Sequence, residues 1–588
     1  MTLQTAYAKI LLNLKSIGVL SFLVMGCKSK EVDQFGAYSE QIRINQIGYY
    51  PKAVKKAVLA DVNGGDTFYL IDTLSKTKVF SGVLSEEQTW GLSNEKVRIA
   101  DFTNFKETGV YSIRIPDVGI SYPFAIRNNV LDTVFKGSIK GLYYQRSGMA
   151  LEKEYAGKWH RATGHPDDSV AFHPSSGKSG GFKASPKGWY DAGDYNKYVI
   201  NANFPLGQWY RLYEEYPEAI ADGALNIPES GNGISDYLDE LKYEMDWALT
   251  MQDDDGGLFH KLTTRNFEGM VMPSEAKAPR FIVGKSTAAT LDFAACAAQA
   301  YRVFFPVDPV YAQTCLAAAK RAYRWAQKNP KKIFVNPVDI HTGEYGDTDV
   351  QDEWFWANAE LYVTTKDRSY LNQLEIDTFN FEFQPGESWT EFMRFLGVFS
   401  LLAKGDFSGE EEMYQKLKQG LLNSANQLAE KAGQFEYFQP IDDFHWGSNS
   451  DVLNAAMLMA QAYRLTRDIK YLKGVQQAMD YILGNNAKGV SYVTGFGDKT
   501  PMFIHHRQSA ADGIPKPVPG LLVGGPNSRL QDGSKGVVYP ENVPPMKAWV
   551  DQERSYASNE VCLNWNAPLT YILGFLEQES DGNGTDVK

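Results

Sequence analysis

The stretch "TAATLDFAACAAQAYRVF", residues 287–304, repeats apolar side chains at steps of three and four residues. This spacing is typical of an α-helix, and similar patterns recur after about residue 130. The chain from there on predicts about a dozen helices joined by long loops rich in Gly, Pro and aromatic residues. Long loops between helices favour a helical toroid over a simple bundle, and they are where we expect the chemistry. The clearest further helices span residues 312–327, 353–365, 389–403, 452–466, 471–483 and 569–578, and less regular ones lie near 131–150, 197–215, 232–252 and 410–430.

The chain before residue 128 has a different pattern. Short segments rich in β-branched and aromatic residues alternate there with Gly, Asp and Asn, which predicts a small β-sandwich over residues 41–128. No low-complexity linker separates it from the helical domain, residues 129–578, so we expect the two to pack together. The polar residues 579–588 are expected to be a flexible tail. The six predicted strands are residues 55–62, 67–73, 77–84, 95–102, 109–115 and 121–127.

The N-terminus has the pattern of a secretory signal over residues 1–26. Lys9 and Lys15 precede the apolar run "IGVLSFLVM", which ends before Gly26 and Cys27. The ending "LVMGC" resembles a bacterial lipobox, in which Cys27 becomes the lipidated first residue and residues 27–40 form a tether. We therefore expect a lipoprotein held in the cell envelope, in the outer membrane, facing the periplasm or the cell surface.

Composition excludes several classes of protein. The 588 residues are 43% hydrophobic and 22% charged, the balance of a soluble globular protein. The net charge of −12 argues against a nucleic-acid partner. The remaining cysteines, Cys296, Cys315 and Cys562, are not at metal-ligand spacing, so we interpret them as small buried hydrophobes.

The stretch "WYDAGDYNKYVI", residues 189–200, holds Asp191 and Asp194 between aromatic residues. Asp and Gly are common turn residues, which is one explanation of the pattern. The other is glycoside hydrolysis, which needs one carboxylic acid to protonate the leaving oxygen and one carboxylate to activate water or attack. In that case Asp194 is the base, and Asp191 orients the water or tunes its partner.

Two later stretches offer the remaining groups. Glu560, in "SYASNEVCLNWNAPL", is either a capping glutamate or the partner acid. In "SYVTGFGDKTPMFIHHRQS", His505, His506 and Arg507 are adjacent. Neighbouring histidines cannot easily ligate one ion, and no carboxylate or cysteine completes a metal set. Donors that hold sugar hydroxyls fit this stretch better.

These stretches together resemble glycoside hydrolase family 9, from about residue 130 to 578 and in the order the family requires. The match includes "YDAGDY", "TGFGDKTPMFIHHR" and "SYASNE…NWNAPL", together with "GLYYQRSGMAL", "HWGSNSDVLNAA" and "PGLLVGGPNS". The earlier stretch "INQIGYYPKAVKKAVL", from Ile44, resembles the immunoglobulin-like domain that often precedes this catalytic domain.

The resemblance implies an immunoglobulin-like β-sandwich followed by an (α/α)6 barrel that hydrolyses β-1,4-glucans with inversion at the anomeric carbon. It implies Asp194 as general base, Asp191 as the residue that positions the water, and Glu560 as general acid. His505 and Arg507 match the substrate-gripping His-x-Arg of the family.

The same resemblance suggests three aromatic residues for substrate binding. Tyr556 lies in the motif that presents the acid. Trp446, in "HWGSN", and Trp189 are candidate platforms for sugar rings, and either is equally compatible with a place in the core.

The chain departs from some relatives at a structural zinc site. Ser147 stands where those relatives have a cysteine, and the later segment "HRATGHPDD" has no cysteine, although His160, His165 and His173 are nearby. We therefore expect no zinc and no required cofactor. Calcium is common in the family, but the sequence does not assign its ligands.

The leading hypothesis is a monomeric, lipid-anchored endo-β-1,4-glucanase for xyloglucan, mixed-linkage glucan or amorphous cellulose. An exo-acting β-glucosidase or glucosaminidase of the same family is an alternative. A glycan-binding lipoprotein without catalysis is a third, but the presence of Asp191, Asp194 and Glu560 argues against it.

Overall fold

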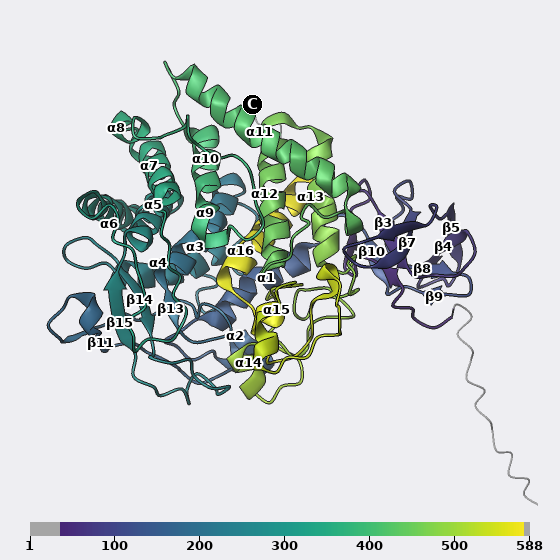
Figure 1. Cartoon of the computed structure of the whole chain (residues 1–588), viewed down its shortest axis with the longest axis horizontal. Coiled ribbons are helices and arrows are strands. Elements are labelled where there is room, and N and C mark those ends of the chain that lie inside the picture. Colours follow the sequence, from purple (N-terminus) through teal and green to yellow (C-terminus); the bar gives the residue numbers. More distant parts are fainter. Residues whose placement is uncertain (1–35, 581–588) are drawn as a thin grey trace, which may run out of the picture.

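The computed structural model describes residues 36–580, so the predicted signal sequence and Cys27 lie outside the described residues. A small β-domain, drawn in purple in Figure 1, packs against one side of a larger helical domain. Within residues 36–580 no helix is long and apolar enough to cross a membrane.

The β-domain is the predicted sandwich, built from two sheets with strand orders β1-β3-β7-β6 and β2-β10-β8-β4-β5. Alternate side chains of the strands, such as Leu59, Phe68 and Ile113, point into a common core. All six predicted strands are present, while β1, β2, β6 and β9 were missed because they have only two or three residues. The strands are β1 (Ile42–Arg43), β2 (Gly48–Tyr49), β3 (Lys56–Ala60), β4 (Thr67–Asp72), β5 (Lys78–Val83), β6 (Gln88–Trp90), β7 (Glu95–Asp101), β8 (Gly109–Ile115), β9 (Gly119–Ile120) and β10 (Phe124–Ile126).

The two domains meet in a specific interface, as the absence of a linker led us to expect. The carboxylate of Glu436 accepts hydrogen bonds from the backbone N–H groups of Leu92 (2.7 Å) and Ser93 (2.8 Å). Beside them the ring of Trp90 packs edge-on against Tyr437, with centroids 4.9 Å apart. The sandwich is therefore fixed to the helical domain by paired polar groups as well as by apolar contact.

The helical domain is an (α/α)6 barrel, as predicted. The inner helices are α3, α5, α7, α10, α12 and α16, and contacts join α16 to α3, α3 to α5, α5 to α7, α7 to α10 and α12 to α16. The main helices are α1 (Asp132–Gln145), α3 (Val199–Glu215), α4 (Asp236–Thr250), α5 (Thr287–Phe304), α6 (Pro309–Lys328), α7 (Gln351–Thr365), α10 (Met393–Lys404), α11 (Glu411–Gln434), α12 (Ser448–Thr466), α13 (Ile469–Ile482) and α16 (Leu563–Glu579). Shorter helices are α2 (Lys153–Ala156), α8 (Arg368–Leu371), α9 (Ser388–Glu391), α14 (Arg507–Ala511) and α15 (Tyr556–Asn559).

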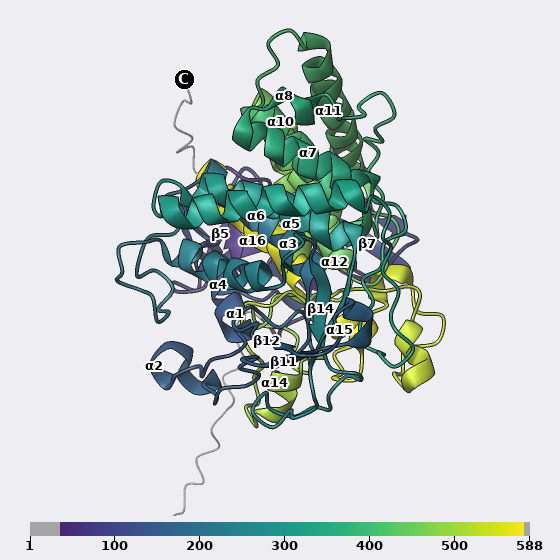
Figure 2. The same ribbon diagram turned by 90° about the vertical axis from the view of Figure 1, so that its left-hand side faces the viewer.

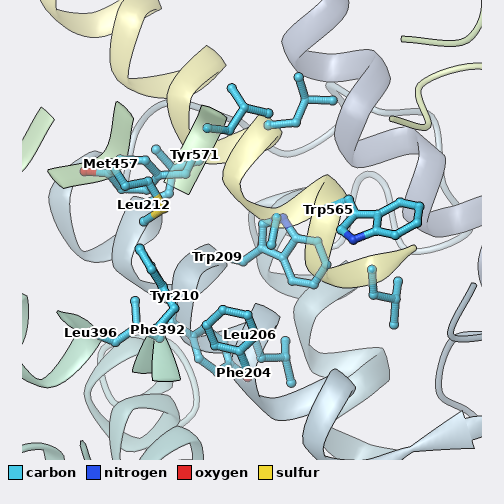
Figure 3. Close-up of a cluster of buried hydrophobic side chains, with 14 of the residues drawn as sticks. Phe204, Leu206, Trp209, Tyr210, Leu212, Phe392, Leu396, Met457, Trp565 and Tyr571 are labelled. Carbon is cyan, nitrogen blue, oxygen red and sulfur yellow. The ribbon is translucent and has the colours of Figure 1, made fainter. Parts of the chain in front are cut away.

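The inner helices are buried on nearly all sides because each contacts helices both beside it in the ring and outside it. Almost every residue of α5 and α16 is buried, whereas α11 on the outside buries only one stripe. Figure 3 shows side chains of α3, such as Trp209 and Tyr210, meeting those of α10, α12 and α16 in this core.

A five-stranded sheet at one end of the barrel was not predicted, because its strands are short and interleaved with loops. Its order is β12-β11-β15-β14-β13, and it lies beyond the ends of the helices in Figure 2. Strand β13 follows the Asp191–Asp194 stretch directly and pairs with β14, Lys197 opposite Leu262. The sheet thus fixes the loop that carries the two aspartates. Its strands are β11 (Val170–Phe172), β12 (Phe182–Lys183), β13 (Lys197–Tyr198), β14 (Phe259–Thr263) and β15 (Phe281–Lys285).

Candidate active site

Three stretches that are far apart in the sequence lie side by side at this end of the barrel. Isolated antiparallel bridge pairing joins Ala192 to Cys562, and parallel bridge pairing joins His505 to Glu560. The backbone N–H of Leu563 also donates to the carbonyl of Asp191 at 2.9 Å. The structure therefore brings the two aspartates, His505 and Glu560 together, as the sequence analysis predicted.

Gly193, between the two aspartates, permits this approach. A Cβ atom at this position would lie 2.0 Å from the carbonyl oxygen of His505 and 3.2 Å from Oε1 of Glu560. Real Cβ atoms do not approach a backbone oxygen so closely, so any side chain here would push the stretches apart. The glycine in "DAGD" is therefore required by the close contact between the aspartate loop and the Glu560 segment.

Asp194 is buried, and its carboxylate is held by neighbouring polar groups. Its Oδ2 accepts hydrogen bonds from the side-chain amide of Asn196 at 2.5 Å and from the hydroxyl of Tyr198 at 3.3 Å. Asn196 is itself fixed by Thr263, whose hydroxyl donates to its amide oxygen at 3.0 Å. These partners leave Oδ1 without a recorded partner in residues 36–580, where it is available to a water molecule.

Asp191 is 2% exposed and uses both oxygens. Oδ1 accepts from the amide of Asn201 at 2.6 Å and Oδ2 accepts from the hydroxyl of Tyr345 at 2.7 Å. Burial and the charge of Asp194 raise the pKa of Asp191 well above its usual range, while these two donors act in the opposite direction. The charge of Asp194 therefore favours the protonated form of Asp191.

Glu560 has the electrostatic setting of an acid. Burial raises the pKa of its carboxyl well above the usual value, and the charge of Asp194 adds to this increase. The guanidinium of Arg507 acts in the opposite direction. A glutamic acid with a raised pKa keeps its proton at higher pH than a free one, which is what proton donation to a leaving group needs.

His505 and Arg507 flank these carboxyls in different ways. The Nδ1 atom of His505 is 2.7 Å from the carbonyl of Glu553, and burial lowers the pKa of its imidazole, which favours a neutral ring. Arg507 is buried, and its Nη1 donates to the carbonyl of Gly193 at 2.8 Å. Arg507 thus supports the aspartate loop directly, a role that its position in a sugar-binding motif did not suggest.

Tyr556 and Trp446 extend from the Glu560 side of the site as a row of rings. The centroid of Tyr556 is 6.2 Å from that of His505 and 5.2 Å from that of Trp446. The side chain of Trp446 is 45% exposed, so it has surface available for a sugar ring.

Trp189 does not have such surface, and the prediction that it is a sugar platform is wrong. It is 1% exposed, and its indole N–H donates to Glu240 at 2.8 Å. Glu240 is paired with the fully buried Arg146, and the backbone N–H of Trp189 donates to Glu244. Trp189 therefore anchors the start of the aspartate loop to helix α4. An aromatic residue next to a catalytic motif does not by itself show which way its ring points.

Sequence reasoning missed four residues at the site: Asn196, Asn201, Tyr345 and Cys562. Asn201 donates to the thiol of Cys562 at 3.2 Å as well as to Asp191. All three cysteines in residues 36–580 are free and buried, as predicted, but Cys562 also contacts the residues that hold Asp191. Tyr345 lies in a loop before α7, and no feature of the sequence connects it with residue 191.

Two of the histidines near the position of the zinc in some relatives, His165 and His173, have protein partners. The Nδ1 atom of His165 is 2.8 Å from the hydroxyl of Tyr190, and the hydroxyl of Ser147 donates to the carbonyl of His165. His173 is paired with Asp339. Among residues 36–580 no three His, Cys, Asp or Glu side chains are grouped so that they could hold a metal ion as they stand.

Comparison with known proteins agrees with this geometry. Residues 132–573 match the family described as glycosyl hydrolase family 9, and residues 37–119 match the cellulase N-terminal ig-like domain. A protein named xyloglucan-specific endo-beta-1,4-glucanase from Bacteroides ovatus is 39% identical over 97% of this chain and 98% of its own. Endoglucanase D from Acetivibrio thermocellus is 36% identical over 96% of this chain and 88% of its own.

A solved structure described as Bacteroides ovatus GH9 superposes with a TM-score of 0.85 at 38% identity, covering 92% of this chain and 99% of that one. Both domains and all three stretches of the site fall within these matches. The chain belongs to glycosyl hydrolase family 9 and is a glycoside hydrolase with an N-terminal immunoglobulin-like domain.

Proposed function

We propose that this protein is an inverting endo-β-1,4-glucanase of the cell envelope and that xyloglucan is its preferred substrate. The observation that carries the mechanism is the contact between the Asp191–Asp194 loop and Glu560, two stretches joined through Ala192 and Cys562. This contact places Glu560, whose pKa is raised, beside Asp194, whose Oδ1 is available to a water molecule. An inverting hydrolase needs both an acid and a carboxylate that activates water.

In the proposed mechanism Glu560 donates its proton to the glycosidic oxygen as the bond to the anomeric carbon breaks. Asp194 takes a proton from the water that attacks the opposite face of the sugar. Asp191 stabilises this water and the loop, because its own oxygens are fixed by Asn201 and Tyr345. Water attack on the opposite face inverts the configuration of the anomeric carbon.

The choice of substrate is supported by the relatives. The Bacteroides ovatus protein, which is similar over nearly the whole length of both chains, is named for xyloglucan, and the Acetivibrio relative is named an endoglucanase. On the Glu560 side, the rings of Tyr556 and Trp446 offer stacking surfaces for glucose units beyond the scissile bond. An exo-acting enzyme would need one end of the substrate-binding cleft to be closed. Comparing viscosity loss with reducing-end formation distinguishes endo from exo action.

We also propose that a lipid on Cys27 anchors the enzyme to the outer membrane as a monomer. The pattern of residues 1–27 supports this proposal, since "LVMGC" follows an apolar run with preceding lysines. Metabolic labelling with a fatty acid, compared between the full chain and Cys27→Ala, tests the anchor directly. Absence of label in both would refute it.

No cofactor takes part in the proposed chemistry, and a structural calcium ion is proposed without assigned ligands, because no three His, Cys, Asp or Glu side chains in residues 36–580 are grouped to hold one. Oxygens of Asp292, Asp352 and Glu353 lack a hydrogen-bond partner in residues 36–580. Burial, with the charge of Asp347, raises the pKa of Asp352 to about 8. Burial of these carboxyls thus favours their protonated forms, and they are not assigned as calcium ligands.

The test of the function is release of reducing sugar from xyloglucan, mixed-linkage glucan, carboxymethylcellulose and aryl β-glucosides. Wild type is compared with Asp194→Ala and Glu560→Ala, and Glu430→Ala on α11 is the control because Glu430 is exposed. We expect polymers to be cut, with rates about 10²-fold or more lower in the two site variants. Cleavage of the small glycosides alone would support the exo mode, and binding without release would refute catalysis.

A further inference from the structure

Phe267 lies in the loop between β14 and β15, and its side chain is 49% exposed. This loop begins beside the base. Asn196, which donates to Asp194, accepts hydrogen bonds from the hydroxyl of Thr263 and the backbone N–H of Thr264, both at 3.0 Å. Phe267 follows Thr264 by three residues, so their Cα atoms are at most roughly 11 Å apart. The loop that carries Phe267 is therefore anchored to the residue that holds Asp194.

The other side of the loop rests on Arg507. The Nε atom of Arg507 donates to the carbonyl of Glu268 at 2.8 Å, and its guanidinium carbon lies 5.6 Å from the centroid of the Phe267 ring. The same guanidinium donates to the carbonyl of Gly193. Arg507 is buried, and its Nε and Nη1 atoms are both hydrogen-bonded. Its guanidinium therefore supports one face of the Phe267 ring and connects the ring to the aspartate loop.

A ring supported on one side and open to solvent on the other is suited to stacking on the apolar face of a sugar. We propose that Phe267 is a binding platform for a pyranose unit of the glucan on the Asp194 side of the site. Tyr556 and Trp446 take the same role on the Glu560 side. The inference rests on the proposed function and deepens it: rings on both sides of the carboxyls require a chain that continues in both directions.

Exposed apolar residues are common on protein surfaces, so a test of Phe267 needs a matched control variant. Phe182 is 70% exposed on β12, the edge strand of the same sheet at the opposite side from β13. Like Phe267, it is an exposed phenylalanine that belongs to or adjoins this sheet, but it lies on the edge strand far from β13. Phe182→Ala therefore controls for the loss of an exposed phenylalanine as such.

The experiment measures binding and turnover separately. Binding of cellohexaose and a xyloglucan oligosaccharide is measured by calorimetry on Glu560→Gln, with and without Phe267→Ala, Phe267→Trp or Phe182→Ala. We expect Phe267→Ala to weaken binding about five- to tenfold, Phe267→Trp to restore it, and Phe182→Ala to leave it unchanged. In the active enzyme, Phe267→Ala should raise KM for the polymer and leave kcat on a short aryl glycoside within about twofold.

Unchanged binding in Phe267→Ala would overturn the platform. So would weakened binding that Phe267→Trp fails to restore, because the ring would then only hold the loop in place. The proposed function has an independent readout: if Glu560→Gln keeps wild-type turnover, the catalytic assignment fails, while the binding data still decide the role of Phe267.

Discussion

The hydroxyl of Tyr345 donates a hydrogen bond of 2.7 Å to Asp191, and Tyr345 reaches it from a left-handed backbone conformation with φ of 47°. Such a conformation is unfavourable for a residue with a side chain, and it persists only where surrounding contacts hold it. The ring is held by packing against Tyr198 and Trp389, with centroids 4.7 and 5.1 Å away. The strained loop thus delivers one donor to the aspartate pair.

Tyr345→Phe keeps the packing of the ring and removes the donor. We expect kcat to fall about 10- to 100-fold, because a hydrogen bond to a charged group contributes about 1.5–3 kcal/mol. The donor lowers the pKa of Asp191, so its loss raises that pKa and moves the acid limb of the rate profile to higher pH. A rate and pH profile equal to wild type would show that the hydroxyl has no role.

Gly193→Ala should inactivate the enzyme by separating the aspartate loop from the Glu560 segment. The new Cβ would lie 2.0 Å from the carbonyl of His505, so one of the two stretches must move by more than an ångström. We expect the rate on xyloglucan to fall about 10²-fold or more. Gly433→Ala is the control, because a Cβ there meets no atom within 4 Å. Full activity of Gly193→Ala would mean that the close approach is not needed.

Arg507→Met should move the alkaline limb of the pH profile upward. The positive charge of Arg507 lowers the pKa of Glu560, so removing it raises that pKa and keeps the acid protonated to higher pH. The rate at the optimum should fall because the support for Gly193 is lost. The profile is compared with Arg529→Met, which removes an exposed arginine paired with Asp443. An alkaline limb that moves downward would contradict the assignment of Glu560 as the acid.

Glu436→Ala should loosen the interface between the two domains. The substitution leaves the backbone N–H groups of Leu92 and Ser93 without their acceptor, which should lower the free energy of unfolding by roughly 2–4 kcal/mol. Calorimetry should show a lower Tm or separate transitions for the domains. Glu430→Ala on the preceding helix, α11, is the control. Unchanged unfolding would show that the interface does not depend on this carboxylate.

A calcium titration tests the proposed ion. We expect millimolar Ca²⁺ to raise Tm of the chelator-treated protein. Without calcium, the combined change Asp352→Asn with Glu353→Gln should make the protein more stable than wild type, because buried carboxyls that repel each other are neutralised. No response of wild type to Ca²⁺ would exclude the proposed ion.

Much of the fold could be predicted because its signals are local. The 3.6-residue periodicity locates helices such as α5, for which the quoted stretch matches the observed bounds, Thr287–Phe304. The sheet β11–β15 was missed because strands of two to five residues have too little sequence to show a pattern. Predicted residues 389–403 are split into α9 and α10 at Phe392, a break that the apolar spacing does not reveal.

The site was predictable where a motif carries the chemistry and unpredictable where only the tertiary structure does. The stretches around Asp194 and Glu560 have a recognisable order, and the structure brings them together. Tyr345 and Asn201 were missed because their contacts with Asp191 depend on how separate loops pack. Trp189 was assigned wrongly for the same reason, since its ring direction follows from Glu240 on α4, which is distant in sequence.

The bridge between Ala192 and Cys562 also has a consequence for biosynthesis. The ribosome makes the proposed base, Asp194, early and the proposed acid, Glu560, shortly before α16, so no growing polypeptide shorter than 560 residues contains both. A nascent or truncated product that ends before Glu560 should therefore be unable to cleave glycan. Hydrolysis is thus itself a readout of a polypeptide that holds both carboxyls in their assembled positions.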